Sequence, residues 1–214
     1  MKSWLGFMVF LLSPMLAQAA APAGVTTVAQ QFAGMMQNSG HRQMVLQSAR
    51  KTPAWARVAC AGAKFSPIPQ IAVYTPILFD KKGMPIAGEW RESLTAAGCG
   101  APMTLNVLTK ITAPGILATG YLLPGTTMGD PILQNAGQAI VVRTLGGIPA
   151  GCGNAFVADT EFAGFEGANG ARKTGPWKEI WTVDLCGPPK KVMVHFAPDN
   201  SGVTVYAEPV AAAP

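Results

Sequence analysis

Two carboxylates beside tryptophans are the residues of this sequence that most readily suggest chemistry. Glu92 and Glu179 each lie two residues after a tryptophan and directly after a cation, within two segments that match without a gap. Both segments, residues 88–102 and 175–189, read G-x-W-[RK]-E-x-x-T-x-x-x-C-G-x-P. Two acids at a set separation suffice to hydrolyse a glycosidic bond, so a small carboxylate-dependent hydrolase is one hypothesis. It requires the two glutamates to meet in an open cleft.

The same segments allow two non-catalytic interpretations. In the first, each tryptophan and its charged neighbours bind a ligand, which gives six candidate binding residues: Trp90, Arg91, Glu92, Trp177, Lys178 and Glu179. In the second, the tryptophans fill the core, because a buried Trp side chain covers a large apolar area, and the glutamates pair with Arg or Lys across a sheet. We expect the structural role and assign no catalytic residue.

Other catalytic arrangements lack the residues they need. A Ser-His-Asp triad requires a histidine that takes the serine proton, and the chain has only His41 and His195. His195 falls on an expected strand, where a hydrogen-bonded structural role is predicted. The sequence contains no G-x-S-x-G, no H-E-x-x-H and no glycine-rich phosphate loop with its lysine. We therefore expect no cofactor.

The N-terminus is typical of an exported protein. Lys2 precedes a short apolar run that ends at an A-x-A cleavage site, so residues 1–19 are predicted to be a signal peptide. No later stretch approaches the roughly 18 consecutive apolar residues of a membrane span, and no cysteine follows the cleavage site to accept a lipid. These features predict a periplasmic or secreted protein without a transmembrane segment.

Four cysteines in an exported chain predict two disulfide bonds. None belongs to a C-x-x-C pair that would offer two thiolates to one atom, so no metal is expected. Among the three connectivities that four cysteines allow, we expect Cys60–Cys99 and Cys152–Cys186, because each half of the chain then has its own pair. Nucleic acid is not an expected partner, since the Lys and Arg residues are scattered along the chain.

Helices are predicted in both halves of the chain. Thr27 is expected to cap a helix in which Val28, Phe32, Met35 and Met36 recur, with a break at Gly40 and a second helix over residues 41–50. In the second half, Asp130-Pro131 is an N-cap with proline at the first helical position, and Gly146-Gly147 ends the helix. Its inner face is expected to comprise Ile132, Leu133, Ala136, Ile140 and Val141.

Strands are predicted downstream of each tryptophan. Residues 177–185 alternate in polarity, residues 192–196 form a second strand, and a turn at residues 199–202 leads into a third over 203–207. Residues 105–109 and 116–123 are expected to form the corresponding hairpin of the first half. The pattern predicts an α+β fold of two tandem repeats, each a helix on an antiparallel sheet with one disulfide, over residues 20–126 and 127–208, with a flexible tail at 209–214. The alternative is a single β-sandwich.

The matching segments resemble a W-[RK]-E…T…C-G segment of uncharacterised exported proteins of Gram-negative bacteria, over residues 88–102 and 175–202. The resemblance implies export and duplication, and it brings no activity, substrate or catalytic residue.

We therefore expect a non-enzymatic binding protein of the cell envelope. A groove between the two repeats would accept another envelope protein, a glycan or an apolar ligand. A further hypothesis is a secreted enzyme inhibitor that presents an exposed turn, either Lys81-Lys82-Gly83 or residues 199–202.

Overall fold

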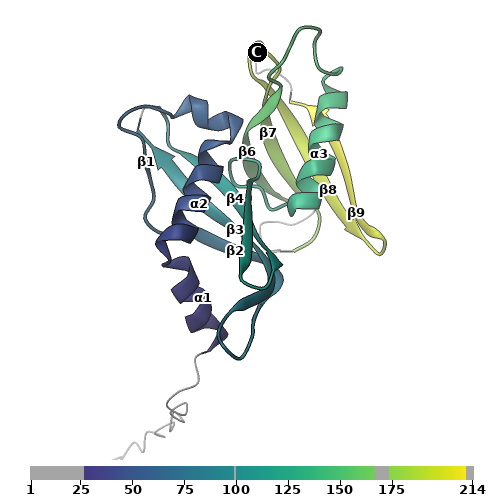
Figure 1. Cartoon of the computed structure of the whole chain (residues 1–214). Helices are drawn as coiled ribbons and strands as arrows, with labels where there is room; N and C mark the ends of the chain where they lie inside the picture. The colour runs from purple at the N-terminus through teal and green to yellow at the C-terminus, as the bar shows by residue number, and fades with distance from the viewer. Residues whose placement is uncertain (1–26, 99, 167–173, 211–214) are drawn as a thin grey trace, which may run out of the picture.

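The computed structural model describes residues 27–98, 100–166 and 174–210. Over these residues the chain is mixed, with three α-helices, one short 3-10 helix and two antiparallel sheets (Figure 1). The signal peptide predicted at residues 1–19 lies outside the described residues. No helix in the described part is long and apolar enough to cross a membrane.

The first sheet, sheet A, follows two helices. The helices α1 (Val28–Met36) and α2 (Ser39–Arg50) and the 3-10 helix η1 (Pro53–Arg57) come first. The strands are β1 (Lys64–Phe65), β2 (Gln70–Phe79), β3 (Pro85–Ala97), β4 (Met103–Ala113) and β5 (Ile116–Tyr121). Strand β3 pairs with β1 and β2 along one edge and with β4 along the other, and β5 pairs with β4. Helix α2 packs on β4 and β5.

The second sheet, sheet B, follows one helix. Helix α3 (Pro131–Thr144) precedes β6 (Phe156–Phe165), β7 (Trp177–Asp184), β8 (Lys190–Asp199) and β9 (Gly202–Pro209). These strands lie in chain order, and α3 packs mainly on β9 and also on β8. Below, the N-terminal half means Val28 to Tyr121 and the C-terminal half means Pro131 to Pro209.

The helix starts follow the capping signals in the sequence. The Thr27 hydroxyl accepts the backbone N–H of Gln30, whose side chain returns to the Thr27 backbone, forming a capping box. The Asp130 carboxylate accepts the N–H of Leu133 at 2.9 Å, as predicted for an N-cap before proline. The predicted break between two helices is present, but it lies at Gln37 and Asn38 rather than at Gly40. Gly40 lies in the first turn of α2, and the side chain of Asn38 caps that helix.

The predicted inner face of α3 is wrong in part. Ile132 is 77% exposed and Ala136 is also exposed, while the buried positions are Gln134, Gly137 and Val141. A Cβ atom at Gly137 would lie only 2.5 Å from Cη2 of Trp181, so the missing side chain lets the helix approach the indole ring. A pattern of apolar residues cannot predict a face that is centred on glycine and glutamine.

Each sheet contains an edge strand that the sequence pattern did not reveal. Strand β2 includes Pro76, and β6 includes Asp159, Glu161 and Gly164, so neither has a clean apolar alternation. Proline and charged side chains are tolerated on edge strands because one side of such a strand carries no ladder. The predicted strands and hairpins around β4–β5 and β7–β9 are confirmed.

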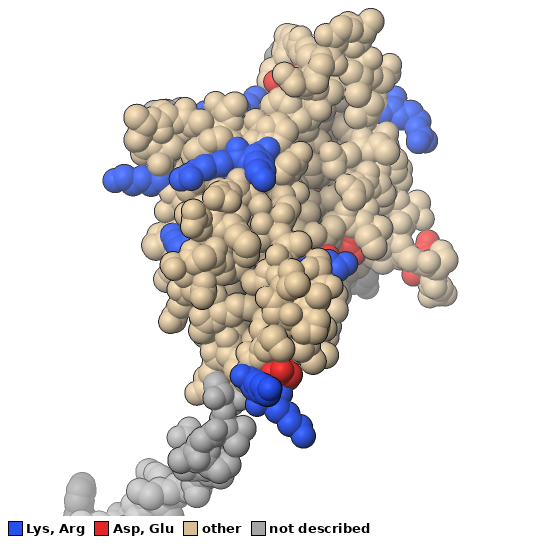
Figure 2. Space-filling view, viewed as in Figure 1, with Lys and Arg blue, Asp and Glu red and all other residues tan. Residues whose placement is uncertain are grey.

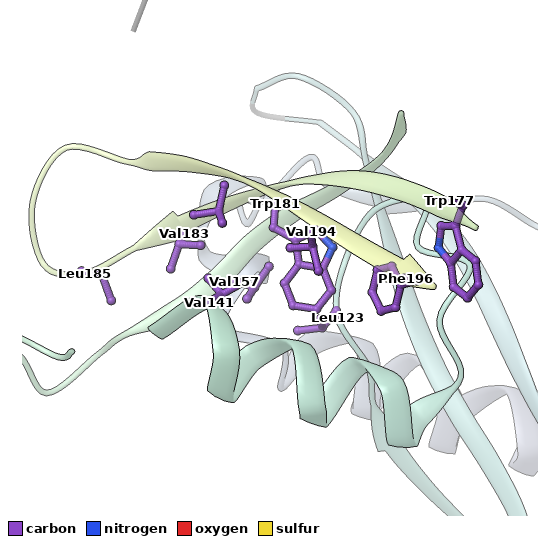
Figure 3. Packing of buried hydrophobic residues seen from close by; sticks show 10 residues of the cluster. Leu123, Val141, Val157, Trp177, Trp181, Val183, Leu185, Val194 and Phe196 are labelled. Carbon is purple, nitrogen blue, oxygen red and sulfur yellow. The ribbon is translucent and has the colours of Figure 1, made fainter. Parts of the chain in front are cut away.

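Two separate clusters of buried side chains form the core. One lies between α2 and sheet A and includes Val45, Ala49, Val58, Leu94, Ala96, Leu105 and Val107. The other lies between α3 and sheet B, where Trp181 and Phe196 face the helix (Figure 3). Its members are Leu123, Val141, Val157, Trp177, Trp181, Val183, Leu185, Val192, Val194 and Phe196. A β-sandwich would place a single core between two sheets, and these clusters are not arranged in that way.

The predicted bond between Cys152 and Cys186 is present, and it ties the segment after α3 to the end of β7. The pairing predicted for Cys60 involves Cys99, which lies outside the described residues. The flexible tail predicted from residue 209 begins too early, because Pro209 belongs to β9 and the Val210 N–H donates to the carbonyl of Lys191 at 3.0 Å. Residues 211–214 lie outside the described residues.

The close approach of α3 to Trp181 predicts the effect of Gly137→Ala. The added methyl group must displace the helix or the ring, and we expect the free energy of unfolding to fall by about 1–3 kcal/mol. Urea unfolding followed by tryptophan fluorescence measures this change.

The matched control is Gly34→Ala in α1, where the new methyl group would meet no atom within 4 Å. Alanine is the better helix former, so this variant should be more stable by about 0.5–1 kcal/mol. Equal effects of the two substitutions would contradict the proposed packing.

Candidate functional site

The two matching sequence segments make the same local contact. Trp90 Nε1–H donates to Glu92 Oε1 at 3.0 Å, and Trp177 Nε1–H donates to Glu179 Oε1 at 3.0 Å. Residues two apart on a strand point to the same face of the sheet. The W-x-E spacing therefore places the indole N–H beside the carboxylate on the core-facing side of β3 and of β7.

Glu92 is enclosed by three donors. Its side chain is 3% exposed, and Oε1 lies 2.8 Å from Nε2 of His41 in α2. Thr109 of β4 donates its hydroxyl to the same oxygen at 3.0 Å, in addition to the Trp90 bond. Moving a carboxylate out of water costs free energy unless hydrogen-bond donors replace the water. These three donors therefore allow Glu92 to be buried.

Glu179 is fully buried and accepts four hydrogen bonds. Besides Trp177, the donors are Nε1 of Trp181 at 2.8 Å, the hydroxyl of Thr127 at 3.2 Å and the backbone N–H of Met128 at 2.8 Å. Thr127 and Met128 belong to the connector, residues 122–130, which joins β5 to α3. The carboxylate thus fixes the connector against sheet B.

This geometry favours the structural interpretation of the six candidate residues. The two tryptophans and the two glutamates are buried, and the glutamates lie in separate networks rather than in a shared cleft. Neither glutamate forms an ion pair with Arg or Lys in the described residues, contrary to our expectation. Arg91 instead donates to the carbonyl of Thr127 at 2.6 Å, on the connector, and Lys178 lies opposite His195 on neighbouring strands.

His195 has the hydrogen-bonded role that its strand position predicts. Its Nδ1 contacts the carboxylate of Glu166, its Nε2 lies 3.4 Å from Glu208, and its ring stacks on Tyr206 with the centroids 4.5 Å apart. These groups hold the imidazole on the face of sheet B opposite the helix. Within the described part of the chain the ring contacts two carboxylates and a tyrosine rather than a serine hydroxyl, so the arrangement does not form a triad.

A pocket of about 440 Å³ lies between the N-terminal and C-terminal halves. The N-terminal half contributes the end of η1 and the start of β4, the connector contributes its middle, and β6 contributes the opposite wall. The lining residues are Arg57, Val58, Ala101, Pro102, Met103, Thr104, Gly125, Thr126, Ala158, Asp159, Thr160 and Glu161. This pocket is the candidate binding site.

The connector holds the two walls of this pocket in place. The Gly125 N–H donates to the carbonyl of Thr104 at 2.8 Å, and the Thr126 N–H donates to the carbonyl of Thr160 at 2.7 Å. The Thr160 hydroxyl in turn donates to the carbonyl of Pro124 at 2.6 Å. Gly125 has φ +95°, and a Cβ there would lie 2.0 Å from the Thr160 carbonyl oxygen, so only glycine fits between the halves.

The charged groups in the pocket are Arg57, Asp159 and Glu161. Burial raises the pKa of Asp159 above its ordinary value, and repulsion from Glu161 adds to the increase. The backbone N–H of Thr160 and the cations Arg57 and Lys191 act in the opposite direction. Carboxylates and a guanidinium in one cleft suit a polar ligand that carries several hydrogen-bonding groups.

Sequence reasoning missed these three residues. Asp159 and Glu161 lie on β6, which had no clear strand pattern, and Arg57 comes from a distant segment that only the tertiary fold brings close.

No group of three or more His, Cys, Asp or Glu side chains suited to a metal ion occurs in the described part of the chain.

The buried network of Glu179 predicts a large effect of Glu179→Gln. The amide would place an NH₂ group among donors, so we expect a loss of about 3 kcal/mol or more in the free energy of unfolding. The matched control is Glu89→Gln, where the carboxylate lies 3.6 Å from the exposed Lys110, and a change below about 1 kcal/mol is expected. Denaturant unfolding checks both values, and a harmless Glu179→Gln would contradict the network.

The raised pKa of Asp159 predicts a pH-dependent effect of Asp159→Asn. The native state binds the Asp159 proton more tightly than the unfolded chain, so the contribution of Asp159 to stability falls as the pH rises through the raised pKa. The variant should therefore be more stable than the parent at pH 7. Below roughly pH 4 the parent carboxyl is protonated in both states, and the difference should disappear. Thermal unfolding across this range measures it, and a variant less stable at pH 7 would refute the assignment.

Comparisons of the chain with protein-family models, with curated proteins and with solved structures find no match. The functional conclusion therefore depends on the geometry of the pocket and of the buried networks.

Proposed function

We propose that this chain is an exported, non-catalytic binding protein of the cell envelope, with its ligand site in the pocket between the two halves. The observation that carries the proposal is the pocket itself, which needs residues from both halves and from the connector. The signal-like N-terminus supports export, and the Cys152–Cys186 bond is compatible with an extracellular or periplasmic location.

We further propose that the two halves are tandem repeats. Four antiparallel strands in the same order follow a helix in each half, if the two-residue strand β1 is set aside. The same indole-to-carboxylate bond lies on the second of these strands in both halves. Duplication accounts for these parallels together with the matching sequence segments.

Among the expected ligand classes, a glycan fits the pocket best. An apolar ligand would desolvate Arg57, Asp159 and Glu161 without giving them partners, which is unfavourable. Hydroxyl and amide groups of a sugar chain donate to carboxylates and accept from a guanidinium. The Thr126 side chain is exposed at the same place, and its hydroxyl accepts the N–H of Phe162 at 3.0 Å.

The test is titration of the protein without its signal peptide with soluble cell-wall glycan fragments, followed by amide NMR. Saturable shifts are expected at Gly125, Thr126 and residues 158–161, and the double variant Arg57→Ala/Glu161→Gln should abolish them. Glu208→Gln, an exposed carboxylate on β9 outside the pocket, is the control and should bind normally.

The same samples distinguish binding from catalysis. Mass spectrometry should return the fragments uncleaved after incubation. Cleavage would support the hydrolase hypothesis, and an absence of shifts at the pocket would refute the glycan site.

A second candidate, a secreted enzyme inhibitor, is favoured by the turn between β2 and β3. The Asp80 carboxylate accepts the N–H groups of Lys82 and Met84 at 2.8 Å each, which fixes the turn. Exposed apolar side chains flank it at Leu78, Met84 and Ile86. Figure 2 shows basic and acidic side chains together at the lower tip of the molecule, and a separate group of Lys and Arg side chains at the upper left. Limited proteolysis tests this candidate: a trypsin-like enzyme is incubated with an unrelated substrate, with and without this protein. An inhibitor would slow the cleavage of that substrate.

A further inference from the structure

We propose that a pocket lined by α1, the start of α2 and residues Pro85, Gly115 and Leu117 of the first sheet and its β4–β5 turn binds a soft monovalent cation, Cu(I) or Ag(I). The ligands would be Nδ1 of His41 and the thioether sulfurs of Met35 and Met44. None of these residues lines the proposed glycan site, so the cation site and the glycan site can be tested independently.

The hydrogen bonding of His41 leaves one ring nitrogen available. Nε2 lies 2.8 Å from Oε1 of Glu92, and the same oxygen accepts from Trp90 and Thr109. An oxygen that acts as acceptor toward these groups assigns the ring proton to Nε2. In the neutral ring Nδ1 then carries a lone pair. This atom is buried and has no hydrogen-bond partner among the described residues. The residue as a whole is 4% exposed. A buried nitrogen without a partner calls for an explanation.

Two methionines line the same pocket as His41. A pocket of about 570 Å³ is lined by His41, Met35 at the end of α1 and Met44 on α2. His41 and Met44 are three residues apart on one helix, so their side chains lie on the same face. Met36 lines a small neighbouring cavity that His41 also reaches. The aromatic ring of Trp90 lies near the imidazole, with the centroids 6.1 Å apart.

This donor set matches the chemistry of a soft cation. Thioether sulfur and imidazole nitrogen select Cu(I), whereas Mg²⁺ and Ca²⁺ prefer oxygen. A carboxylate that accepts the second ring N–H of a histidine is the usual outer partner of a metal-binding imidazole, because it fixes the tautomer and the ring orientation. A monovalent cation at Nδ1 would also offset the buried negative charge of Glu92.

The experiment uses Ag(I), which needs no reductant, with the protein labelled at the methionine methyl carbons and the histidine nitrogens. Titration should give saturable, one-to-one shifts of the Met35 and Met44 methyl signals and of the His41 Nδ1 signal. The double variant Met35→Leu/Met44→Leu conserves side-chain volume, so it should keep the fold and lose the saturable binding. Glu92→Gln should weaken binding by roughly ten- to hundredfold through the orientation of His41.

The control is Met193→Leu on β8, in the other half of the molecule, which should bind like the parent. Uniform weak shifts of all methionines, or an unchanged His41 Nδ1 signal at saturation, would overturn the proposal. Unaltered binding by the double variant with an intact far-ultraviolet spectrum would also overturn it. Glycan titrations of the same variants should be normal, which separates this site from the pocket between the halves.

Discussion

The burial of two glutamate side chains is the constraint on which the rest of this structure depends. Moving a carboxylate out of water costs many kilocalories per mole unless hydrogen bonds replace its hydration. Glu92 and Glu179 meet this condition with indole, hydroxyl, imidazole and backbone donors. Each donor must therefore lie within hydrogen-bond distance of its carboxylate. This requirement fixes the position of the helix, strand or connector that carries the donor.

The same constraint links the two halves. Glu179 takes two of its four donors from the connector, and Arg91, the neighbour of Glu92 in sequence, donates to the carbonyl of Thr127 in that connector. The carboxylate network of sheet B is thus tied to β3 of sheet A through one short segment. Because Gly125 of this segment also bonds to Thr104, the connector sets the spacing of the walls around the pocket.

Because of these networks, the carboxylates of the core and those of the surface have different roles. The carboxylates that look most reactive in the sequence are used to hold the fold, whereas Asp159 and Glu161 line an open pocket from an edge strand. A protein with few charged residues places two of its carboxylates inside, and most of the face seen in Figure 2 is uncharged. The charged side chains that remain accessible in the pocket are those available to the proposed ligand.

The sequence by itself determined the helix starts at Thr27 and Asp130 and the hairpins after each tryptophan, because caps, turns and alternating polarity act over a few residues. The Cys152–Cys186 pairing was expected from the repeat, and the tertiary structure brings the two cysteines together across 34 residues. Only the tertiary structure decided which face of α3 is buried, because that depends on the fit of Gly137 to a ring on another element. It also decided the edge strands β2 and β6, whose residues need no apolar alternation. The sequence could not predict the pocket between the halves, because its charged residues come from distant segments. These segments meet only when the connector has folded between them.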